Sequence, residues 1–133
     1  MLEVVQARSQ RVLGWVVLPN HYHVIARTSS ALAMIRGLGR LHARTATAWN
    51  REEGRAGHQV WCRCTETAMK SNRHLWATLH YVFHNPVKHG FASTWEEWPY
   101  SSFHAWLATH DTVEAEWLRS QFPIDNYGRG WDD

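Results

Sequence analysis

The chain has 133 residues, of which 44% are hydrophobic, and this is enough for a single domain with a buried core. No run of about 18 or more apolar residues occurs, and the first residues lack the apolar stretch of a secretory signal, so neither a membrane span nor export is predicted. The two cysteines, Cys62 and Cys64, are too few for a four-ligand zinc site or a disulfide framework, which favours a cytoplasmic protein with reduced thiols.

Charge is distributed unevenly along the chain. Residues 1–90 carry 12 Lys and Arg against 4 Asp and Glu, a net charge of +8, whereas residues 91–133 carry 2 against 8, a net charge of −6. A basic body with an acidic tail predicts an anionic partner, most simply nucleic acid, although ordinary scatter of surface charge is the alternative. The nine tryptophans are expected mainly in the core, with some available to stack on unpaired bases.

Two strands are predicted near the N-terminus. Residues 11–18 form an apolar, β-branched run, which is typical of a strand covered on both faces. Pro19-Asn20 interrupts this run, and residues 21–26 then read as a second strand. The two strands are expected to form a hairpin, although Pro19 lacks the N–H of an ordinary ladder residue.

A helix over about residues 31–50 is predicted to follow, with Ser29 or Ser30 as its N-cap. On one face of this helix three arginines recur at every fourth position, and they are the best candidates for contacts with DNA phosphates. A solvated helix face without a ligand is the alternative. The three residues are Arg36, Arg40 and Arg44.

Two longer helices are predicted in the second half, separated by a tryptophan-rich turn region and a short helix. The first covers about residues 66–84, with a break near Ser71-Asn72 as the alternative, and is expected to end at Asn85, because Pro86 disfavours the α conformation in the residue before it. The second begins at a capping box of Asp111 and Glu114 and ends before the next proline, and the tail after it is expected to fray. The apolar face of the first helix comprises Leu75, Leu79, Val82 and Phe83.

His21 and His23 lie two residues apart on a predicted strand. Because side chains alternate across a strand, both face the same side, with backbones roughly 6–7 Å apart. Two imidazoles on one face can bind one divalent ion. Taken alone, the pattern is explained better by two structural histidines.

Tyr81 and Asn85 lie four residues apart on a predicted helix, one turn above the other. Both lie away from the apolar face of that helix, so neither is expected to be a core residue. A tyrosine that the core does not need is a candidate nucleophile. The alternative is a surface tyrosine followed by an asparagine that caps the helix.

Together these four residues have the chemistry for cleaving a phosphodiester. Attack needs a nucleophile in line and neutralisation of charge at the phosphate. A tyrosine phenol near a cation can supply the first, and a metal held by His21, His23 and the amide oxygen of Asn85 can supply the second. Mixed nitrogen and oxygen ligands suit Mg²⁺ or Mn²⁺, and the imidazoles favour Mn²⁺.

Four segments form an ordered set: VLPNHYHVIA (17–26), WCR (61–63), YVFHNPVKHGFAS (81–93) and EEWPYSSFHAWL (96–107). In this order and approximate spacing they resemble motifs of the REP-associated tyrosine transposases, which are single-tyrosine HUH (His-hydrophobe-His) enzymes. The first resembles the HUH strand, the second a W-Q-x motif, the third the catalytic helix with its NPV-x-x-G exit, and the fourth a WPWSS segment. The resemblance covers about residues 11–107.

The resemblance implies an α+β fold, namely a ferredoxin-like HUH-type sandwich with helices packed on an antiparallel sheet. It also implies an activity in DNA transposition. In the family a tyrosine attacks single-stranded DNA, forms a 5′-phosphotyrosine and releases a 3′-hydroxyl. The reverse step rejoins DNA without a nucleotide cofactor.

Carried over position by position, the resemblance assigns Tyr81 as the nucleophile. His21 and His23 become metal ligands, with Asn85 as the third, and the metal would be Mg²⁺ or Mn²⁺. Two basic residues flank the catalytic helix and are expected to hold the DNA strand near the nucleophile. They are Arg73 and Lys88, and the neighbouring His84 and His89 are expected to be bystanders.

We expect a transposase-like domain over residues 1–110 and a C-terminal helix with an acidic tail over residues 111–133. Only 20 residues precede His21, where family members have a further strand, so we expect a truncated copy or a sheet that lacks this strand. An open sheet edge would suit pairing with a second subunit in a homodimer. The expected partner is single-stranded or hairpin DNA, without a membrane, and the expected location is cytoplasmic and nucleoid-associated.

Three other functions compete with an active transposase. A domesticated or truncated relative would bind DNA hairpins without cutting them. A hydrolytic metal enzyme would use water, with a passive Tyr81. An unrelated small α+β interaction domain would bind no metal, and the ordered set of motifs argues against it.

Overall fold

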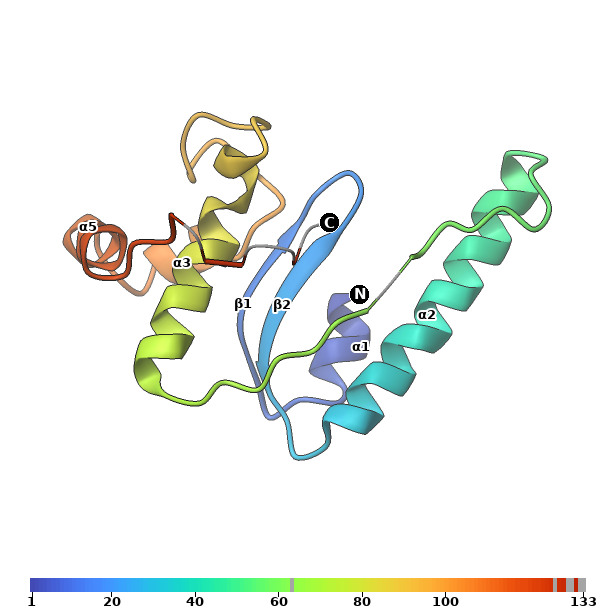
Figure 1. Cartoon of the computed structure of the whole chain (residues 1–133), viewed down its shortest axis with the longest axis horizontal. Helices are drawn as coiled ribbons and strands as arrows, with labels where there is room; N and C mark the ends of the chain where they lie inside the picture. Colours follow the sequence, from blue (N-terminus) through green and yellow to red (C-terminus); the bar gives the residue numbers. More distant parts are fainter. Residues whose placement is uncertain (63, 126, 129–130, 132–133) are drawn as a thin grey trace. The chain divides into compact units, whose positions relative to one another are not determined.

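The computed structural model describes residues 1–62, 64–125, 127–128 and 131 of the chain (Figure 1). Its helices and strands confirm an α+β fold with an antiparallel strand pair. Within the described residues, no helix is both long enough and apolar enough to cross a membrane. In chain order the elements are α1 (Leu2–Gln6), β1 (Arg11–Val17), β2 (Tyr22–Arg27), α2 (Ala31–Glu52), α3 (Asn72–Lys88), α4 (Phe103–Leu107) and α5 (Thr112–Gln121).

The chain divides into two compact units, each described here by itself. The first unit contains Met1–Val12 and Ala26–Glu66, and the second contains Leu13–Ile25 and Thr67–Asp133. The hairpin turn, α3, α4 and α5 therefore belong to the second unit, whereas α1 and α2 belong to the first.

The predicted hairpin is confirmed, with strand ends within one residue of the expected ones. The Leu18 N–H donates to the carbonyl of His21 at 2.8 Å and closes the turn. Pro19 lies inside this turn, where a missing N–H breaks no ladder bond. A third segment extends the sheet, because Val16 forms an antiparallel bridge with Ser101.

In the first unit, α1 packs against the long helix α2. The hydroxyl of Ser30 caps α2 by accepting from the Ala33 N–H at 3.2 Å, as predicted. The α1 helix was not predicted from the sequence.

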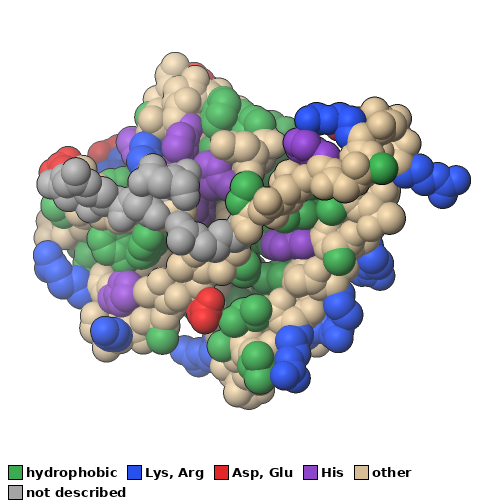
Figure 2. Space-filling model, turned by 45° about the vertical axis from the view of Figure 1, so that its right-hand side comes forward, with side chains coloured by type: hydrophobic (Ala, Val, Ile, Leu, Met, Phe, Trp, Pro, Cys, Tyr) green, Lys and Arg blue, Asp and Glu red, His purple; other side chains and the backbone are tan. Residues whose placement is uncertain are grey.

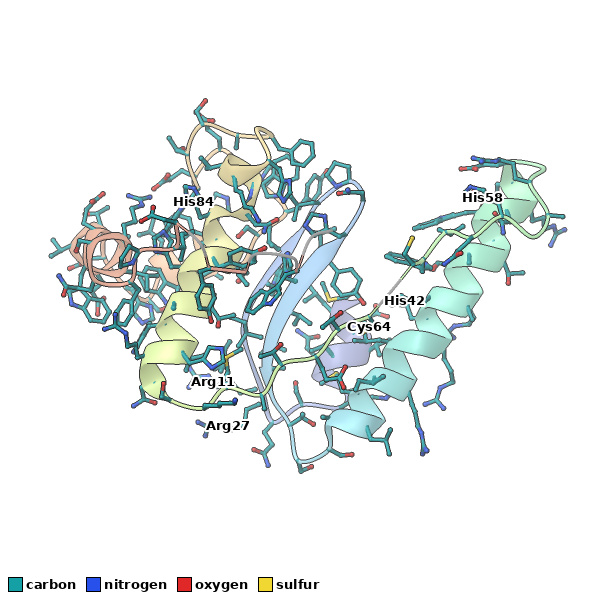
Figure 3. The ribbon with its side chains drawn as sticks, viewed as in Figure 1. Arg11, Arg27, His42, His58, Cys64 and His84 are labelled. Carbon is teal, nitrogen blue, oxygen red and sulfur yellow. The ribbon has the colours of Figure 1, made fainter. Side chains whose placement is uncertain are left out.

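In Figure 3, Arg11 and Arg27 lie at one end of the strand pair, where β1 begins and β2 ends.

In the second unit, α3 begins at Asn72, at the alternative break rather than at residue 66, because the Ser71 hydroxyl caps it by accepting from the His74 N–H at 3.1 Å. The predicted end at Asn85 was also wrong, because the helix continues through Pro86 to Lys88. The preference of a residue before proline is local and weak. Here burial of both Asn85 and Pro86 overrides it.

A Schellman turn ends α3 after the proline. The Gly90 N–H donates to the Val87 carbonyl at 3.0 Å, and the Phe91 N–H donates to the Pro86 carbonyl at 2.8 Å. Gly90 has a φ of 71°, which a residue with a side chain rarely adopts. This glycine therefore sets the direction in which the chain leaves α3.

The core of the second unit joins the hairpin, α3, α4 and α5. The predicted capping box of Asp111 and Glu114 starts α5, and both of its hydrogen bonds are present. Trp95 is buried and its ring contacts Phe83 and Phe103, as expected for a core tryptophan. The buried cluster comprises Val16, Leu18, Ile25, Leu79, Val82, Phe83, Trp95, Phe103, Ala115 and Leu118.

Candidate active site

The two histidines of the H-x-H pattern lie at the tip of the hairpin. His21 precedes the first residue of β2, and His23 is the second residue of that strand. Their ring centroids are 5.1 Å apart. Two imidazoles that share one ion have centroids roughly 4.5–5.2 Å apart, given metal–nitrogen bonds of about 2.1 Å. The observed spacing fits a shared ion.

Asn85 reaches this histidine pair from α3. Its side chain is fully buried, and its Oδ1 lies 3.1 Å from the Nε2 of His21. Two ligands of one octahedral ion with bonds of about 2.1 Å lie about 3.0 Å apart. The amide oxygen is therefore placed where a third ligand would be.

Asn20 contacts the other nitrogen of the same ring. The Nδ1 of His21 lies 2.8 Å from the Oδ1 of Asn20. A neutral imidazole has one N–H, so a donation to Asn20 leaves a lone pair on Nε2 that faces the oxygen of Asn85. A cation between these two acceptors would satisfy both. Ligating histidines are oriented by this kind of hydrogen bond at the second nitrogen.

The candidate third ligand is an amide rather than a third imidazole, thiolate or carboxylate. Across the part of the chain that the structure describes, no three His, Cys, Asp or Glu side chains come together in a way that could hold a metal. The fit of a metal thus depends on the set of His21, His23 and Asn85. This set of two imidazoles and one amide oxygen suits Mn²⁺ or Mg²⁺.

Tyr81 lies one helical turn before Asn85 and is 1% exposed. The prediction that Tyr81 and Asn85 avoid the core was therefore wrong. The helix has a second covered face, away from its aliphatic stripe, where the ring of Tyr81 lies 5.4 Å from that of His23. Lys88 donates to the Tyr81 hydroxyl at 3.3 Å, so a cation adjoins the phenol oxygen.

The C-terminal segment covers Tyr81. The rings of Tyr127 and Trp131 lie 6.0 Å and 5.2 Å from its ring. A Cβ at Gly128 would clash with the Cε2 of Tyr81, so the Gly128 backbone passes directly over the ring. The structure places these three residues of the tail against Tyr81, and the other residues after Asp125 lie outside the described part, so fraying of the tail stays a prediction.

Two histidines expected to be bystanders differ in their surroundings. The ring of His89 lies 5.2 Å from that of His21, so it belongs to the site. His84 instead accepts from the Trp95 indole at 3.2 Å. Burial lowers the pKa of this half-buried ring, as do Arg119 and Lys88, and Figure 3 labels it on α3.

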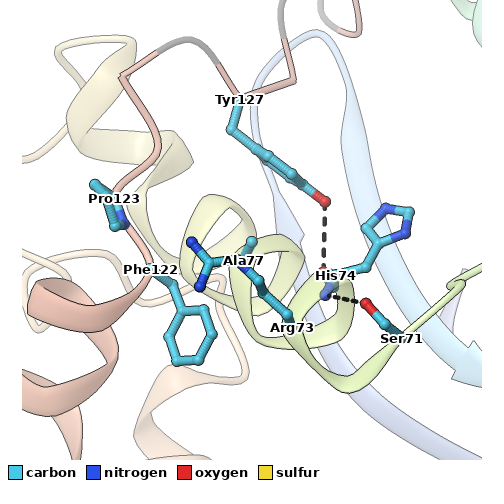
Figure 4. Close-up of a pocket in the computed structure, with 7 residues that line it drawn as sticks. All are labelled: Ser71, Arg73, His74, Ala77, Phe122, Pro123 and Tyr127. Carbon is cyan, nitrogen blue, oxygen red and sulfur yellow. Dashed lines mark hydrogen bonds between the residues drawn. The ribbon is translucent and has the colours of Figure 1, made fainter.

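Arg73 does not reach the histidines. It lines a cavity of about 310 Å³ at the start of α3, together with His74, Phe122 and Tyr127 (Figure 4). Its guanidinium lies 6.0 Å from the ring centroid of Phe122. The cavity adjoins the candidate nucleophile through Tyr127, which contacts both the cavity and the ring of Tyr81.

The arginine stripe of α2 is exposed, as a phosphate-binding face requires. Figure 2 shows Lys and Arg side chains standing out along α2, in the right-hand part of the view. The stripe belongs to the first unit, and the nucleophile belongs to the second. The WCR motif contributes Trp61, which stacks on His42 at 4.3 Å, whereas Arg63 lies outside the described residues.

Sequence reasoning missed three parts of this site: Asn20, the covering C-terminal residues and His89. A side-chain oxygen one residue before the first histidine was a usable signal for Asn20. No local pattern indicates that Tyr127, Gly128 and Trp131 return to α3.

No family model matches the chain. A REP-associated tyrosine transposase of Escherichia coli (strain K12) is 27% identical over 131 residues, which are 94% of this chain and 67% of the relative. A putative REP-associated tyrosine transposase of Haemophilus influenzae is 39% identical over 54 residues, which are 41% of this chain and 28% of the relative.

A solved structure gives the same family. It is a REP-associated tyrosine transposase bound to a REP hairpin, with a TM-score of 0.59 and 25% identity. The match covers 80% of this chain and 62% of the solved chain, so this chain spans less than two thirds of that protein. In its motifs, sequence and fold, the chain is similar to the REP-associated tyrosine transposases.

Proposed function

We propose that this protein cleaves and rejoins single-stranded DNA in transposition, with Tyr81 as the nucleophile. One observation carries the proposal. The Tyr81 hydroxyl accepts from the Lys88 ammonium and its ring contacts the imidazole of His23, on the same side of α3 as Asn85, whose amide contacts His21. A nucleophile, a cation and a candidate metal site thus converge within one compact unit.

In the proposed step, the Tyr81 oxygen attacks a backbone phosphorus of the DNA. A bond forms between phosphorus and the phenol oxygen, and the bond from phosphorus to the 3′ oxygen breaks. The phenol loses its proton and the 3′ oxygen gains one, so the products are a 5′-phosphotyrosine and a 3′-hydroxyl. Attack by a 3′-hydroxyl on the phosphotyrosine reverses the step and rejoins DNA.

Lys88 would stabilise the attacking phenolate of Tyr81, because its ammonium lies beside the phenol oxygen. His21, His23 and Asn85 would hold Mg²⁺ or Mn²⁺, with Asn20 orienting the first histidine. When bound, the ion supplies positive charge that neutralises the phosphate oxygens.

The DNA partner is proposed from the relatives. The similar solved protein is bound to a REP hairpin, and the first 90 residues of this chain carry the net positive charge that such a partner needs. The exposed Arg36, Arg40 and Arg44 are proposed phosphate contacts. The homodimer, the domain boundary at residue 110 and the nucleoid location stay predictions.

The burial of Tyr81 means that its ring must be uncovered before it can attack DNA. A phosphate cannot reach a phenol that is 1% exposed, so Gly128 must leave the ring before attack. The proposed enzyme therefore has a covered state and a reactive state. DNA or a metal that binds the reactive state better would shift the population toward it.

A covalent-adduct assay tests the proposal. Hairpin DNAs with single-stranded flanks are labelled at either the 5′ or the 3′ end and incubated with the protein and Mn²⁺ or Mg²⁺. On a denaturing gel, only the 3′-labelled strand should migrate with the protein, because Tyr81 retains the 5′ phosphate. Tyr81→Phe and a chelator should remove this band, whereas Tyr22→Phe, the matched loss of a hydroxyl, should keep it.

The competing functions give different products. A hydrolytic enzyme leaves two unattached strands and no adduct, and Tyr81→Phe keeps its activity. A relative that binds without cutting gives a shifted complex on a native gel and intact DNA on a denaturing gel. Either result across a panel of hairpins would refute the proposed nucleophile.

A further inference from the structure

We propose that a row of aromatic rings leads away from the candidate metal site and stacks on unpaired bases of the DNA strand. This aromatic track starts at His21 and continues through His89, Phe91, Trp98 and Tyr100. It deepens the proposed function, because it assigns the surface that holds the single strand beside the point of cleavage.

The rings follow each other at regular intervals. From His21 to His89 the centroids are 5.2 Å apart, and from His89 to Phe91 they are 6.2 Å apart. Trp98 lies 5.7 Å beyond Phe91, and Tyr100 lies 5.9 Å beyond Trp98. The track is therefore continuous with the site, and its first member is itself a candidate metal ligand.

Each outer ring is attached to a fixed backbone. The Phe91 N–H is one of the two donors of the Schellman turn of α3. The Trp98 indole donates to the Val17 carbonyl at 2.9 Å, and the Tyr100 carbonyl accepts from the Val17 N–H at 2.8 Å. The segment that carries both rings thus pairs with the end of β1, beside the hairpin turn that carries His21 (Figure 1).

Exposure and charge favour bases as the ligand. Phe91 is 44% exposed and Tyr100 is 62% exposed, so their ring faces are accessible. Nearby carboxylates are already engaged, because Glu97 accepts from the Ser93 N–H at 2.6 Å and Glu96 pairs with Arg119 at 3.4 Å. The exposed rings of the track suit stacking on bases better than binding of phosphates, because phosphate binding needs a surplus of positive charge. Stacking on rings tolerates any base sequence.

The test measures binding of fluorescent oligothymidine and oligoadenine single strands by anisotropy in a chelator, so that no cleavage occurs. Phe91→Ala and Tyr100→Ala should each weaken binding roughly fivefold or more. The salt dependence of binding should not change, because no phosphate contact is lost. Tyr100→Phe should restore most of the affinity that Tyr100→Ala loses, since it restores the ring.

The matched control is Trp117→Ala. Trp117 is also 44% exposed, but its ring contacts are with Trp76 and Phe122. The Trp117→Ala variant should bind single strands with the affinity of the wild type. A strand without bases should bind weakly to the wild type and to all variants. Any of three results would overturn the aromatic track. The first is equal affinity of the wild type, Phe91→Ala and Tyr100→Ala for single strands. The others are no measurable binding by the wild type and a reduced salt dependence of binding in the variants. The adduct assay judges the proposed nucleophile separately, because stacking is read without cleavage.

Discussion

The Nε2 of His21 lies 3.1 Å from the Oδ1 of Asn85, although the two residues are 64 positions apart. This contact predicts that Asn85→Ala weakens Mn²⁺ binding roughly tenfold or more, because a ligand oxygen is lost. Asn85→Asp should bind Mn²⁺ at least as well as the wild type, since a carboxylate oxygen takes the same place. Mn²⁺ titration followed by electron paramagnetic resonance measures both without DNA.

The control for this variant is Asn72→Ala, an exposed asparagine at the start of the same helix. Within the described residues, the Nδ2 of Asn85 has no hydrogen-bond partner, so its removal should leave the fold intact. A thermal melt checks this. Unchanged Mn²⁺ affinity in folded Asn85→Ala would remove the amide from the site.

Lys88→Gln should slow adduct formation by roughly tenfold or more, because the charged donor beside the Tyr81 oxygen is lost. Lys88→Arg should retain part of the rate. The matched control is Lys70→Gln, which changes the chain's other lysine at an exposed position. A rate that falls only in proportion to DNA affinity, measured in chelator, would make Lys88 a phosphate contact instead.

Gly128→Val should expose Tyr81 and speed adduct formation. Gly128 has a φ of 71°, and a Cβ there would meet the Tyr81 ring, so valine forces the segment off the phenol. Gly57→Val is the control, because Gly57 has a φ of 79° but open space around its Cβ position. Slower adduct formation in Gly128→Val would show that the segment helps to build the reactive site.

The features predicted correctly from the sequence depend on local signals. The break at Pro19 separated two β-branched runs and located the hairpin. Ser30 marked the start of α2, and the box of Asp111 and Glu114 marked the start of α5. Each signal needs only residues within one turn of chain, so no knowledge of distant contacts was required.

The features that were mispredicted depend on contacts between distant segments. The preference of Asn85 for extended backbone was overcome by its burial against the hairpin, which no helical pattern reveals. Tyr81 was placed away from the core because only one apolar face was considered. Its cover comes from residues about 50 positions later, such as Trp131.

His80 makes stability depend on pH. Burial lowers its pKa below 6.5, and His84 and Arg119 lower it further, whereas its bond to the Phe122 carbonyl acts in the opposite direction. Between the folded pKa and 6.5 the unfolded chain binds more protons, so this contribution is complete above 6.5 and is lost as the pH falls toward the folded pKa. Urea unfolding at pH 7.5, 6.5 and 5.5 should show a smaller decrease for His80→Gln than for the wild type. Equal decreases would exclude His80 as the source.

The arginine stripe of α2 is tested by the salt dependence of DNA binding. If Arg36 or Arg40 contacts a phosphate, its change to alanine should lower the slope of log affinity against log salt by about 0.7 on single strands. Arg55→Ala is the control, since Arg55 is exposed and already pairs with Glu53 at 3.6 Å. This result would differ from that of Phe91→Ala, which should weaken binding at constant slope. Because charge contacts and ring contacts respond differently to salt, one titration series separates the two surfaces, and an unchanged slope in both arginine variants would leave the stripe as a solvated helix face.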